Sequence, residues 1–491
     1  MIDASQPRDL TTLIKAYDVR GVVPEELNAE VARAIGAALA DIVILPEHDE
    51  AKGRPTVVIG RDMRASGPEL VAAFAAGLGM RGVDAVLIGL CSTDGLYHAS
   101  GVLEMPGAMF TASHNPAQYN GIKLCRAGAR PVSEISGLAE VRDLTARYLD
   151  GGISVAAIRG TVTEREMLRG YAEFLRGLVD LSGIRPLRVV VDAGNGMGGH
   201  TVPAVLADGA GLPKLPLEII PLYFELDGTF PNHEANPLEP ANLRDLQAAV
   251  VAHGADIGIA FDGDADRCFV IDEHGEPVSP SAITALVGLR EVERERAEGR
   301  VPTIIYNLIT SQVVPDLIKA AGGRTVRTRV GHSFIKAQMA EHNAVFGGEH
   351  SAHYYFRDFF FADTGMLAAM HVLSALGATE APLSHLAEAY SPYSASGEIN
   401  SRVADVAAVR ARVVRAFVDD VVAGPVTIDE LDGVTISHWD EQPRWWFNLR
   451  ASNTEPLLRL NVEAAERDVM ERVRDEVLAL VRSDDAAGSP A

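Results

Sequence analysis

The chain repeats one local pattern, an apolar strand-like stretch that ends in a short polar loop. The clearest copies run from 107–110 into 111–116, from 257–261 into 262–267, and from 343–346 into 347–351. We interpret them as three divergent copies of one α/β unit. Open α/β sheets place ligands outside the carboxyl ends of their strands, so each polar loop is a candidate binding loop and the three are expected to face one cleft.

Helical and strand-like patterns alternate in the first part of the chain. Apolar residues at helical spacing predict helices at 24–43 and 66–79, and β-branched apolar runs predict strands at 56–59 and 84–90. The same pattern returns where 188–191 leads into 192–196 and where 302–306 leads into 307–311. This alternation predicts α/β domains with largely parallel or mixed sheets.

The last hundred residues follow a different pattern. Residues 388–397 have the composition of a linker. Beyond them the sequence predicts a helix, strands near 434–439, 444–450 and 457–462, a final helix over 465–481, and a frayed end at 483–491. This part is expected to be a smaller α+β domain, with Trp445 and Trp446 packed in its core and strands.

The fold class is therefore three similar α/β mixed-sheet domains and a smaller C-terminal α+β domain around a central cleft. At 491 residues the chain is more than three times as long as a usual domain of roughly 150 residues. The predicted domains are, in chain order, 1–158 with the serine loop, 159–277 with the aspartate loop, 278–389 with the glycine-glutamate loop, and 390–491 with the arginine-serine loop.

Composition excludes several classes of function. The 67 acidic and 44 basic side chains give a formal charge of −23, which disfavours nucleic acid and anionic membranes as partners. The three cysteines form no CxxC pair, so neither a disulfide framework nor a thiolate zinc site is indicated. The N-terminus lacks an apolar signal region, and no run of about 18 apolar residues occurs, so a cytoplasmic, soluble protein is expected.

The most informative loop is Asp-Gly-Asp-Ala-Asp-Arg at 262–267, which places three carboxylates two residues apart after an apolar strand. Such clustered charge needs a cation, and hard oxygen ligands favour Mg²⁺. A calcium loop is an alternative because Glu273 is twelfth from Asp262, but Arg267 stands sixth, where an EF-hand requires glycine. A solvated acidic turn is the other alternative.

The serine loop, Thr-Ala-Ser-His-Asn-Pro at 111–116, places Ser113 at the end of a strand. No GxSxG elbow is present, so acyl transfer is not supported, whereas a serine beside a metal is able to carry a phosphoryl group. From this segment alone, a turn stabilised by side-chain hydrogen bonds explains the residues equally well.

Two further loops suit a phosphorylated sugar. The segment Arg-Ala-Ser-Asn-Thr-Glu-Pro at 450–456 offers donors for a phosphate dianion, and 348–351 offers a carboxylate, an imidazole and a hydroxyl for sugar hydroxyls. Polar turns are the alternative for both. Arg20, Lys123 and His332, taken singly, are more typical of surface charges or structural histidines.

Taken together in this order, the four loops resemble the α-D-phosphohexomutase family, specifically its bacterial phosphomannomutase/phosphoglucomutase branch. The resemblance spans nearly the whole chain, with one loop in each of four domains, and the joint match is far more specific than any single motif. It implies an isomerase that moves phosphate between the 1- and 6-positions of a hexose, through a phosphoserine at Ser113 and a bound hexose 1,6-bisphosphate.

The resemblance also implies roles for individual residues. The Mg²⁺ ligands would be Asp262, Asp264, Asp266 and a phosphorylated Ser113. Residues near the transferring group would be Ser113, His114, Lys123, Arg267, His332 and Arg20, with Lys123 and His332 both open as general base. Substrate contacts would come from Tyr17, Glu349, Ser351 and His353, and from the phosphate-binding residues Arg450, Ser452, Asn453 and Thr454.

The expected cofactors are Mg²⁺ and a hexose 1,6-bisphosphate, such as glucose 1,6-bisphosphate, as activator. The expected partner is a small phosphosugar, with no nucleic acid or membrane and a monomer or weak homo-oligomer. Ile309 stands where many relatives have lysine, and His350 and Ala352 replace the common Met and Gly. The preferred sugar therefore stays open. The alternatives are a phosphoglucosamine mutase, a Mg²⁺-dependent sugar phosphatase, and a non-catalytic calcium-stabilised binding protein.

Overall fold

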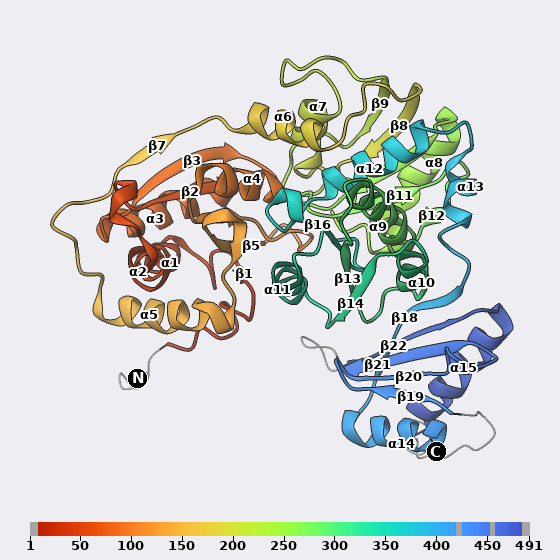
Figure 1. Ribbon diagram of the computed structural model, residues 1–491. Helices are drawn as coiled ribbons and strands as arrows, with labels where there is room; N and C mark the ends of the chain where they lie inside the picture. The colour runs from red at the N-terminus through yellow and green to blue at the C-terminus, as the bar shows by residue number, and fades with distance from the viewer. Residues whose placement is uncertain (1–7, 419–424, 452–456, 484–491) are drawn as a thin grey trace. The chain divides into compact units, whose positions relative to one another are not determined.

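A computed structural model describes residues 8–418, 425–451 and 457–483. The chain, traced in Figure 1, divides into two compact units, one made of the described residues of 1–278 and 351–385 and the other of those of 279–350 and 386–491. The predicted fold class is confirmed in its four-domain α/β architecture with mixed sheets. None of the helices in the described ranges combines the length and hydropathy needed to span a bilayer.

The first sheet of the larger unit has the order β1-β5-β4-β2-β3-β7, with β6 paired to β5. Its strands are β1 Val19–Val22, β2 Thr56–Arg61, β3 Asp84–Leu90, β4 Gly107–Phe110, β5 Tyr119–Arg126, β6 Arg130–Pro131 and β7 Val162–Glu164. Strands β2, β3, β4 and β7 are parallel, whereas β5 runs antiparallel to both β4 and β1. The antiparallel β5 brings its residues back along the strand that feeds the serine loop.

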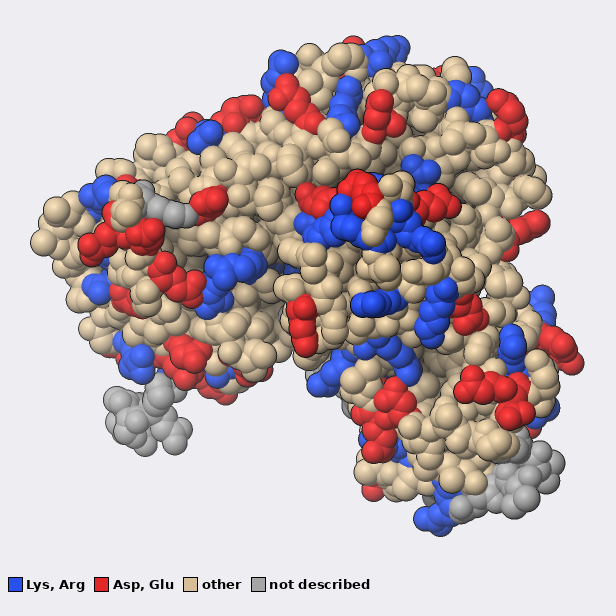
Figure 2. All heavy atoms as spheres, in the orientation of Figure 1, with Lys and Arg blue, Asp and Glu red and all other residues tan. Residues whose placement is uncertain are grey.

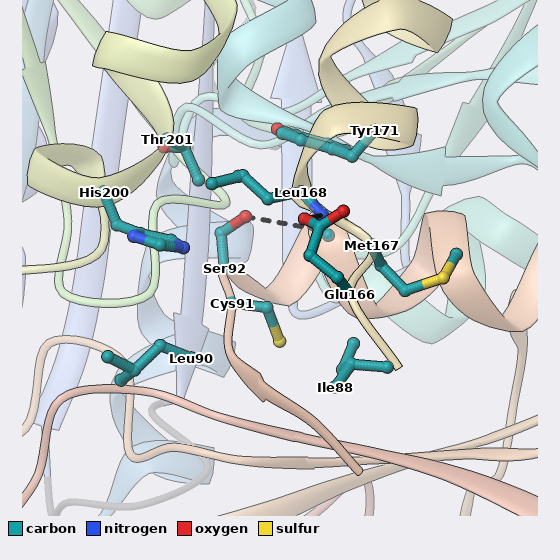
Figure 3. Close-up of a pocket in the computed structure, with 11 residues that line it drawn as sticks. Ile88, Leu90, Cys91, Ser92, Glu166, Met167, Leu168, Tyr171, His200 and Thr201 are labelled. Carbon is teal, nitrogen blue, oxygen red and sulfur yellow. Dashed lines mark hydrogen bonds between the residues drawn. The ribbon is translucent and has the colours of Figure 1, made fainter. Parts of the chain in front are cut away.

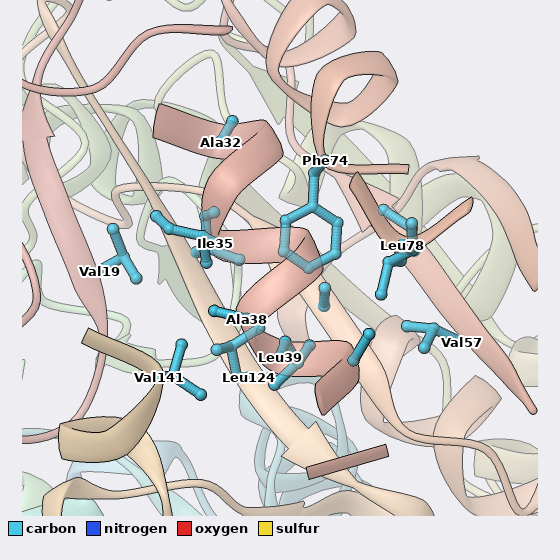
Figure 4. Close-up of a cluster of buried hydrophobic side chains, with 14 of the residues drawn as sticks. Val19, Ala32, Ile35, Ala38, Leu39, Val57, Phe74, Leu78, Leu124 and Val141 are labelled. Atoms are coloured by element: carbon cyan, nitrogen blue, oxygen red, sulfur yellow. The ribbon is translucent and has the colours of Figure 1, made fainter. Parts of the chain in front are cut away.

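The helices of this domain are α1 Ala29–Leu39, α2 Leu45–Glu47, α3 Gly67–Met80, α4 Thr93–Leu103 and α5 Leu138–Gly151. Side chains of α1, α3 and α5 are buried in its core. Ile35, Phe74 and Leu78 from α1 and α3 meet Leu124 of β5 in one buried cluster (Figure 4). Burying such apolar side chains is the main stabilising contribution to a domain of this kind.

The second sheet of the larger unit has the order β12-β11-β10-β8-β9. Its strands are β8 Leu187–Asp192, β9 Leu217–Leu222, β10 Ile257–Phe261, β11 Cys268–Ile271 and β12 Pro277–Val278, and its helices are α6 Leu168–Leu178, α7 Gly198–Val205 and α8 Arg244–His253. β10 is parallel to β8 and buried throughout. The aspartate loop therefore leaves the carboxyl end of a central strand, as predicted. β16 Tyr354–Phe356, β17 Ala362–Asp363 and α12 Gly365–Gly377 complete this unit.

The smaller unit contains a parallel sheet and an antiparallel sheet. The parallel strands are β13 Thr303–Asn307, β14 Arg324–Thr328 and β15 Phe346–Gly348, with helices α9 Pro280–Ala297, α10 Val313–Ala320 and α11 His332–His342. The antiparallel sheet has the order β18-β22-β21-β20-β19. Its elements are β18 Ser394–Arg402, β19 Thr427–Asp429, β20 Val434–Ser437, β21 Trp445–Ala451, β22 Leu457–Ala464, α14 Val406–Val418 and α15 Arg467–Val481.

Trp445 and Trp446 pack as predicted. Both are buried, and Trp445 stacks on Phe447 and meets Phe417 of α14 edge-on. Trp446 also donates a hydrogen bond from Nε1 to the buried Glu463, 2.7 Å away. That contact satisfies the indole N–H, which a buried tryptophan needs.

Three sequence expectations about element boundaries were wrong. The first helix begins at Ala29 rather than at 24, because the Asn28 side chain accepts hydrogen bonds from the Glu30 and Val31 amides and caps it. The strand expected at 343–346 begins at Phe346, since Asn343 instead ends α11 in a left-handed conformation. Part of the expected linker is β18, a largely polar edge strand that, among the described strands, pairs only with β22 and so lacks an apolar signature.

Acidic and basic side chains are interspersed on the face shown in Figure 2. The acidic excess is therefore not gathered there into a single continuous patch. Positive charge that serves an anionic substrate must be placed by individual side chains in the site.

Candidate active site at the serine and aspartate loops

Ser113 is held in an uncommon backbone conformation at the end of β4. Its φ is 48°, in the left-handed region, and its amide donates to Thr111 Oγ1 at 2.9 Å. The side chain is buried, and Oγ donates to Asp262 Oδ2 at 2.8 Å. The serine loop and the aspartate loop, 149 residues apart in sequence, therefore meet at these two side chains.

The three aspartates of the loop after β10 form one buried group. Asp262, Asp264 and Asp266 are almost fully shielded from solvent, and one carboxylate oxygen from each lies within 4.8 Å of the others. Ala265 takes a left-handed φ of 59°, which turns the chain inside the loop. Alternate residues of one short loop are thus directed at one point.

Besides the Ser113 hydroxyl, two cations and a second hydroxyl contact this group. Lys123 of β5 places Nζ 2.7 Å from Asp264 Oδ2 and 2.6 Å from Asp266 Oδ2. Thr93, the first residue of α4, donates from Oγ1 to Asp264 Oδ2 at 2.5 Å. Arg267 Nε lies 3.5 Å from Asp262 Oδ2.

The charges perturb one another strongly. Burial, together with the charges of Asp266 and Asp264, raises the pKa of Asp262 well above its usual range. Burial also opposes the charged form of Asp266, but Lys123 and His353 outweigh it, so the pKa of Asp266 is lowered. The same balance applies to Lys123: burial opposes its charge, yet Asp264 and Asp266 raise its pKa well above the usual value. Lys123 is therefore an ammonium in this arrangement.

The His114 imidazole is neutral, because a neighbouring positive charge and burial both disfavour its protonated form. The Arg267 guanidinium, followed by burial, lowers the pKa of His114 to about 2. Arg267 Nη2 lies 3.1 Å from His114 Nδ1, and Ser113 Oγ lies 3.3 Å from the same nitrogen. A guanidinium can only donate, so His114 Nδ1 carries a lone pair.

The residues present fit a Mg²⁺ ion. Asp264 Oδ1 and Asp266 Oδ1 are buried and make no hydrogen bond within the described part of the chain. Buried carboxylate oxygens without a hydrogen bond are costly, and a hard divalent cation with oxygen ligands would satisfy them. The calcium-loop alternative is disfavoured, because Glu273 lies in the turn between β11 and β12 and accepts a hydrogen bond from the Ser384 amide at 3.1 Å.

His353 lies beside the aspartates. Arg267 Nε donates to His353 Nε2 at 3.2 Å, and this nitrogen is 3.7 Å from Asp266 Oδ1. Ser351 Oγ lies 3.1 Å from the other ring nitrogen. Two residues expected to contact the sugar are thus connected to the group around Asp266.

Arg20 and Tyr17 come from the segment around β1. Arg20 donates to Asn115 Oδ1 at 2.7 Å and to Asp18 Oδ2 at 2.5 Å, so it reaches the serine loop from the side. Tyr17 is half-buried.

The remaining predicted residues belong to the smaller unit. Glu349 is buried and accepts hydrogen bonds at 3.2 Å from Asn307 Nδ2 and from the Gly331 amide. Arg450 is buried and donates to Glu398 Oε2 at 2.9 Å. His332 begins α11, but its side chain lies outside the described part, as do Ser452, Asn453 and Thr454.

Sequence reasoning missed two side chains that support the site. Thr93 binds Asp264 through its side chain, and Arg64 donates to the Ser113 carbonyl at 2.9 Å. Both lie just beyond the carboxyl ends of parallel strands, β3 and β2. The sequence signal that could have identified them is their position just after predicted strands, where α/β proteins bind ligands.

A separate cavity of about 290 Å³ lies within the larger unit (Figure 3). Its lining is mostly apolar and includes Ile88, Met167 and Leu168, with Ser92 and His200 among the polar residues. Neither Ser113 nor any of the three aspartates lines it. The candidate active site is therefore the serine–aspartate group and not this cavity.

Four family models match the chain in succession. They describe phosphoglucomutase/phosphomannomutase alpha/beta/alpha domain I over residues 11–147, domain II over 169–275, domain III over 279–393, and the C-terminal domain over 398–480. This chain belongs to the phosphoglucomutase/phosphomannomutase family. The α-D-phosphohexomutase resemblance predicted from the four loops is confirmed.

Curated relatives and solved structures agree with this membership. A phosphomannomutase of Salmonella typhimurium is 40% identical over 473 residues, which cover 96% of this chain and 99% of that protein. A Xanthomonas campestris protein named phosphohexose mutases is 39% identical, covering 95% of this chain and 98% of that one. The crystal structure of a phosphoglucomutase/phosphomannomutase family protein from Burkholderia thailandensis superposes with a TM-score of 0.81 at 29% identity, covering 98% of each chain. The chain is thus an isomerase, a hexose phosphate mutase of this family.

Proposed function

We propose that this mutase interconverts hexose 1-phosphate and hexose 6-phosphate, with mannose, glucose or both as the sugar, through a phosphorylated Ser113 and a bound hexose 1,6-bisphosphate. The observation that carries the proposal is the 2.8 Å contact between Ser113 Oγ and Asp262 inside the buried aspartate group. The relatives named phosphomannomutase and phosphohexose mutases support the choice of substrate.

In the proposed cycle, the phosphoryl group leaves Ser113 Oγ for a sugar hydroxyl, so one P–O bond breaks and another forms. The sugar hydroxyl loses a proton, and the serine hydroxyl is regenerated. The bisphosphate then presents its other phosphate to Ser113, which takes that group and releases the isomeric monophosphate. Each transfer demands alignment and neutralisation of negative charge on the transferring oxygens.

The residues around Ser113 suit these demands. Lys123 and Arg267 are cations beside the aspartate group, and ion pairs with the aspartates fix the positions of both side chains. Bound Mg²⁺ would add Lewis-acid polarisation of a phosphoryl oxygen, with Asp262, Asp264 and Asp266 as its protein ligands. Lys123 would also act as an electrostatic contact, and Lys123 and His332 are the two predicted candidates for the general base.

We assign the substrate contacts from the family resemblance. Glu349 and Ser351 would bind sugar hydroxyls, Tyr17 and His353 would contact the substrate, and Arg20 and His114 would lie near the transferring group. The phosphate-binding residues would be Arg450, Ser452, Asn453 and Thr454. Ile309 in place of lysine, and His350 in place of methionine, make the sugar preference a question for experiment.

The test is a coupled assay of the purified protein with mannose 1-phosphate, glucose 1-phosphate and glucosamine 1-phosphate, each with Mg²⁺ and catalytic hexose 1,6-bisphosphate. Formation of a 6-phosphate from mannose or glucose supports the proposal. Turnover of the glucosamine ester alone would instead indicate a phosphoglucosamine mutase, and release of inorganic phosphate would indicate a phosphatase.

Intact mass, measured alongside the assay, tests the phosphoserine. Incubation with the bisphosphate is expected to add one phosphoryl group to the wild type and none to Ser113→Ala, which should also lose turnover. Ser133→Ala is the matched control, because Ser133 caps a short helical turn in the same unit and makes no contact with the aspartates. A phosphorylated Ser113→Ala variant would contradict the assignment.

A further inference from the structure

Arg64 is a buried guanidinium that contacts one loop four times. It follows β2, and its side chain is 1% exposed. Nη1 donates to the carbonyl oxygens of Pro116 and Tyr119, both at 2.8 Å. Nη2 donates to those of Ser113, at 2.9 Å, and Asn115, at 2.6 Å.

The guanidinium is itself fixed from two other sides. Asp62 Oδ2 forms an ion pair with Arg64 Nε at 3.3 Å, and Asp62 Oδ1 accepts from the Arg64 amide at 2.9 Å. The Phe230 ring, from the segment after β9, lies over the guanidinium with its centroid 5.2 Å from Cζ. A Cβ on neighbouring Gly228 would meet Arg64 Cα at 2.9 Å, so this segment packs closely against Arg64.

These contacts constrain the serine loop in a particular way. A guanidinium is planar and presents its donors in a fixed fork, so four carbonyls on one fork are fixed relative to one another. The loop needs such restraint, because Ser113 holds a left-handed φ of 48° that a residue with a side chain seldom adopts. The side-chain hydrogen bonds of Arg64 to this loop all end on backbone carbonyls, and its ion pair is with Asp62, so it holds the loop through the backbone, while its charge also interacts with Asp264.

We propose that Arg64 is a positioning residue for the mutase reaction, one that clamps the backbone of residues 113–119 so that Ser113 Oγ keeps facing the aspartate group. The proposal rests on the proposed function of Ser113. A serine that alternates between a hydroxyl and a phosphate changes its charge by about −1.5 to −2 beside three carboxylates. A clamp on neutral backbone carbonyls holds the loop in both states.

The principal test compares Arg64→Lys with Arg176→Lys. Lysine keeps the charge but loses the fork, so the loop is expected to loosen. Arg176 is the matched control, because its guanidinium donates to three carbonyls, those of Val205, Pro213 and Ala207, away from the serine loop. We expect Arg64→Lys to lower kcat about 10- to 100-fold with KM changed less than about 3-fold, since misplacing a reacting group by about 1 Å costs that much. Arg176→Lys should leave kcat unchanged.

Two further readouts separate positioning from a general loss of structure. Hydrogen exchange followed by mass spectrometry should show faster exchange in the peptide containing 113–121 for Arg64→Lys and not for Arg176→Lys. Free guanidinium at a low millimolar concentration should partly restore the kcat of Arg64→Ala, whereas NaCl at the same concentration should not. If Arg64→Ala does not fold, Gly228→Ala, which presses on the backbone of Arg64, should reproduce the exchange change and the fall in kcat.

The proposal is overturned if folded Arg64→Lys keeps kcat within about 2-fold of the wild type, or if exchange in 113–121 is unchanged. It is also overturned if Arg176→Lys loses kcat to the same extent. The exchange readout needs no substrate. If exchange is faster in Arg64→Lys but the wild-type protein is inactive on every sugar phosphate, the role of Arg64 in holding the loop stands and the proposed function is rejected.

Discussion

Lys123 Nζ lies 2.6 Å from Asp266 Oδ2, so a lysine of one domain's sheet forms an ion pair with the acidic loop of the next. The pair joins β5 of the first sheet to the loop after β10 of the second, across 143 residues of sequence. Lys123 also binds Asp264, and both carboxylates are buried. The contact therefore links the stability of this unit to the state of the candidate metal site.

Replacing Lys123 by methionine is expected to destabilise the protein more without Mg²⁺ than with it. Removing one partner of a buried ion pair typically costs about 3–5 kcal/mol, because a carboxylate is left uncompensated. A divalent cation at the aspartates would offset part of that cost. Melting temperatures in EDTA and in excess Mg²⁺ measure the difference. Arg54→Met, which breaks the more exposed pair with Asp84, is the control and should show no Mg²⁺ dependence.

Gly263→Ala should separate the serine and aspartate loops. A Cβ at this position would lie 2.4 Å from the Ser113 carbonyl oxygen, which is backbone that cannot rotate away. We expect a loss of about 1–3 kcal/mol in stability, as is typical of overpacking, and a fall of about 100-fold in kcat from misalignment. Gly151→Ala is the control, since nothing lies within 4 Å of its added Cβ. Wild-type kcat in Gly263→Ala would show that the close approach is unimportant.

Arg267 is expected to control the protonation of His114. In the wild type the pKa of His114 is lowered to about 2, first by Arg267 and then by burial, so the ring should stay neutral from pH 5 to 9. In Arg267→Met the main opposing charge is gone, and the pKa should rise toward the ordinary value of about 6.5. The histidine ring resonances in NMR spectra, assigned with His114→Gln, report the titration. A ring that stays neutral down to pH 5 in Arg267→Met would mean that burial dominates.

Asp94 should make stability fall as pH rises from about 4 to about 6. Burial raises its pKa to about 6, although Tyr171 and Thr364 each donate to it at 2.7 Å. The folded protein therefore holds this proton more tightly than the unfolded chain, and the stabilisation is complete below about pH 4 and lost as pH passes about 6.

Asp94→Asn removes this dependence, so its melting temperature relative to the wild type should rise between pH 4.5 and 7, on the order of 5 °C. Asp180→Asn is the control: a hydrogen bond from the Ser182 amide lowers the pKa of Asp180, so this carboxyl is largely ionised in both the folded and the unfolded state between pH 4.5 and 7, and the melting temperature of the variant relative to the wild type should stay constant there. A constant difference between Asp94→Asn and the wild type across this range would contradict the shifted pKa.

Much of the site was predictable because its chemistry is local in sequence. The three aspartates, the serine loop and the glycine-glutamate loop each follow an apolar strand, and strand ends of α/β sheets are where ligands bind. Boundaries were less predictable: the polar edge strand β18 has no apolar face to identify it, and the Asn28 cap decided where α1 begins.

The sequence by itself determined the four-domain architecture, the family and which aspartate and serine residues form the candidate site, because these depend on local patterns of apolar and polar residues. Only the tertiary structure decided which side chains contact the buried aspartates and hold the serine loop. Lys123, Thr93 and Arg64 reach the loops through contacts between strands and segments far apart in sequence. Their effect depends on distance and burial, since the strength of an ion pair or hydrogen bond is set by geometry and by the exclusion of water.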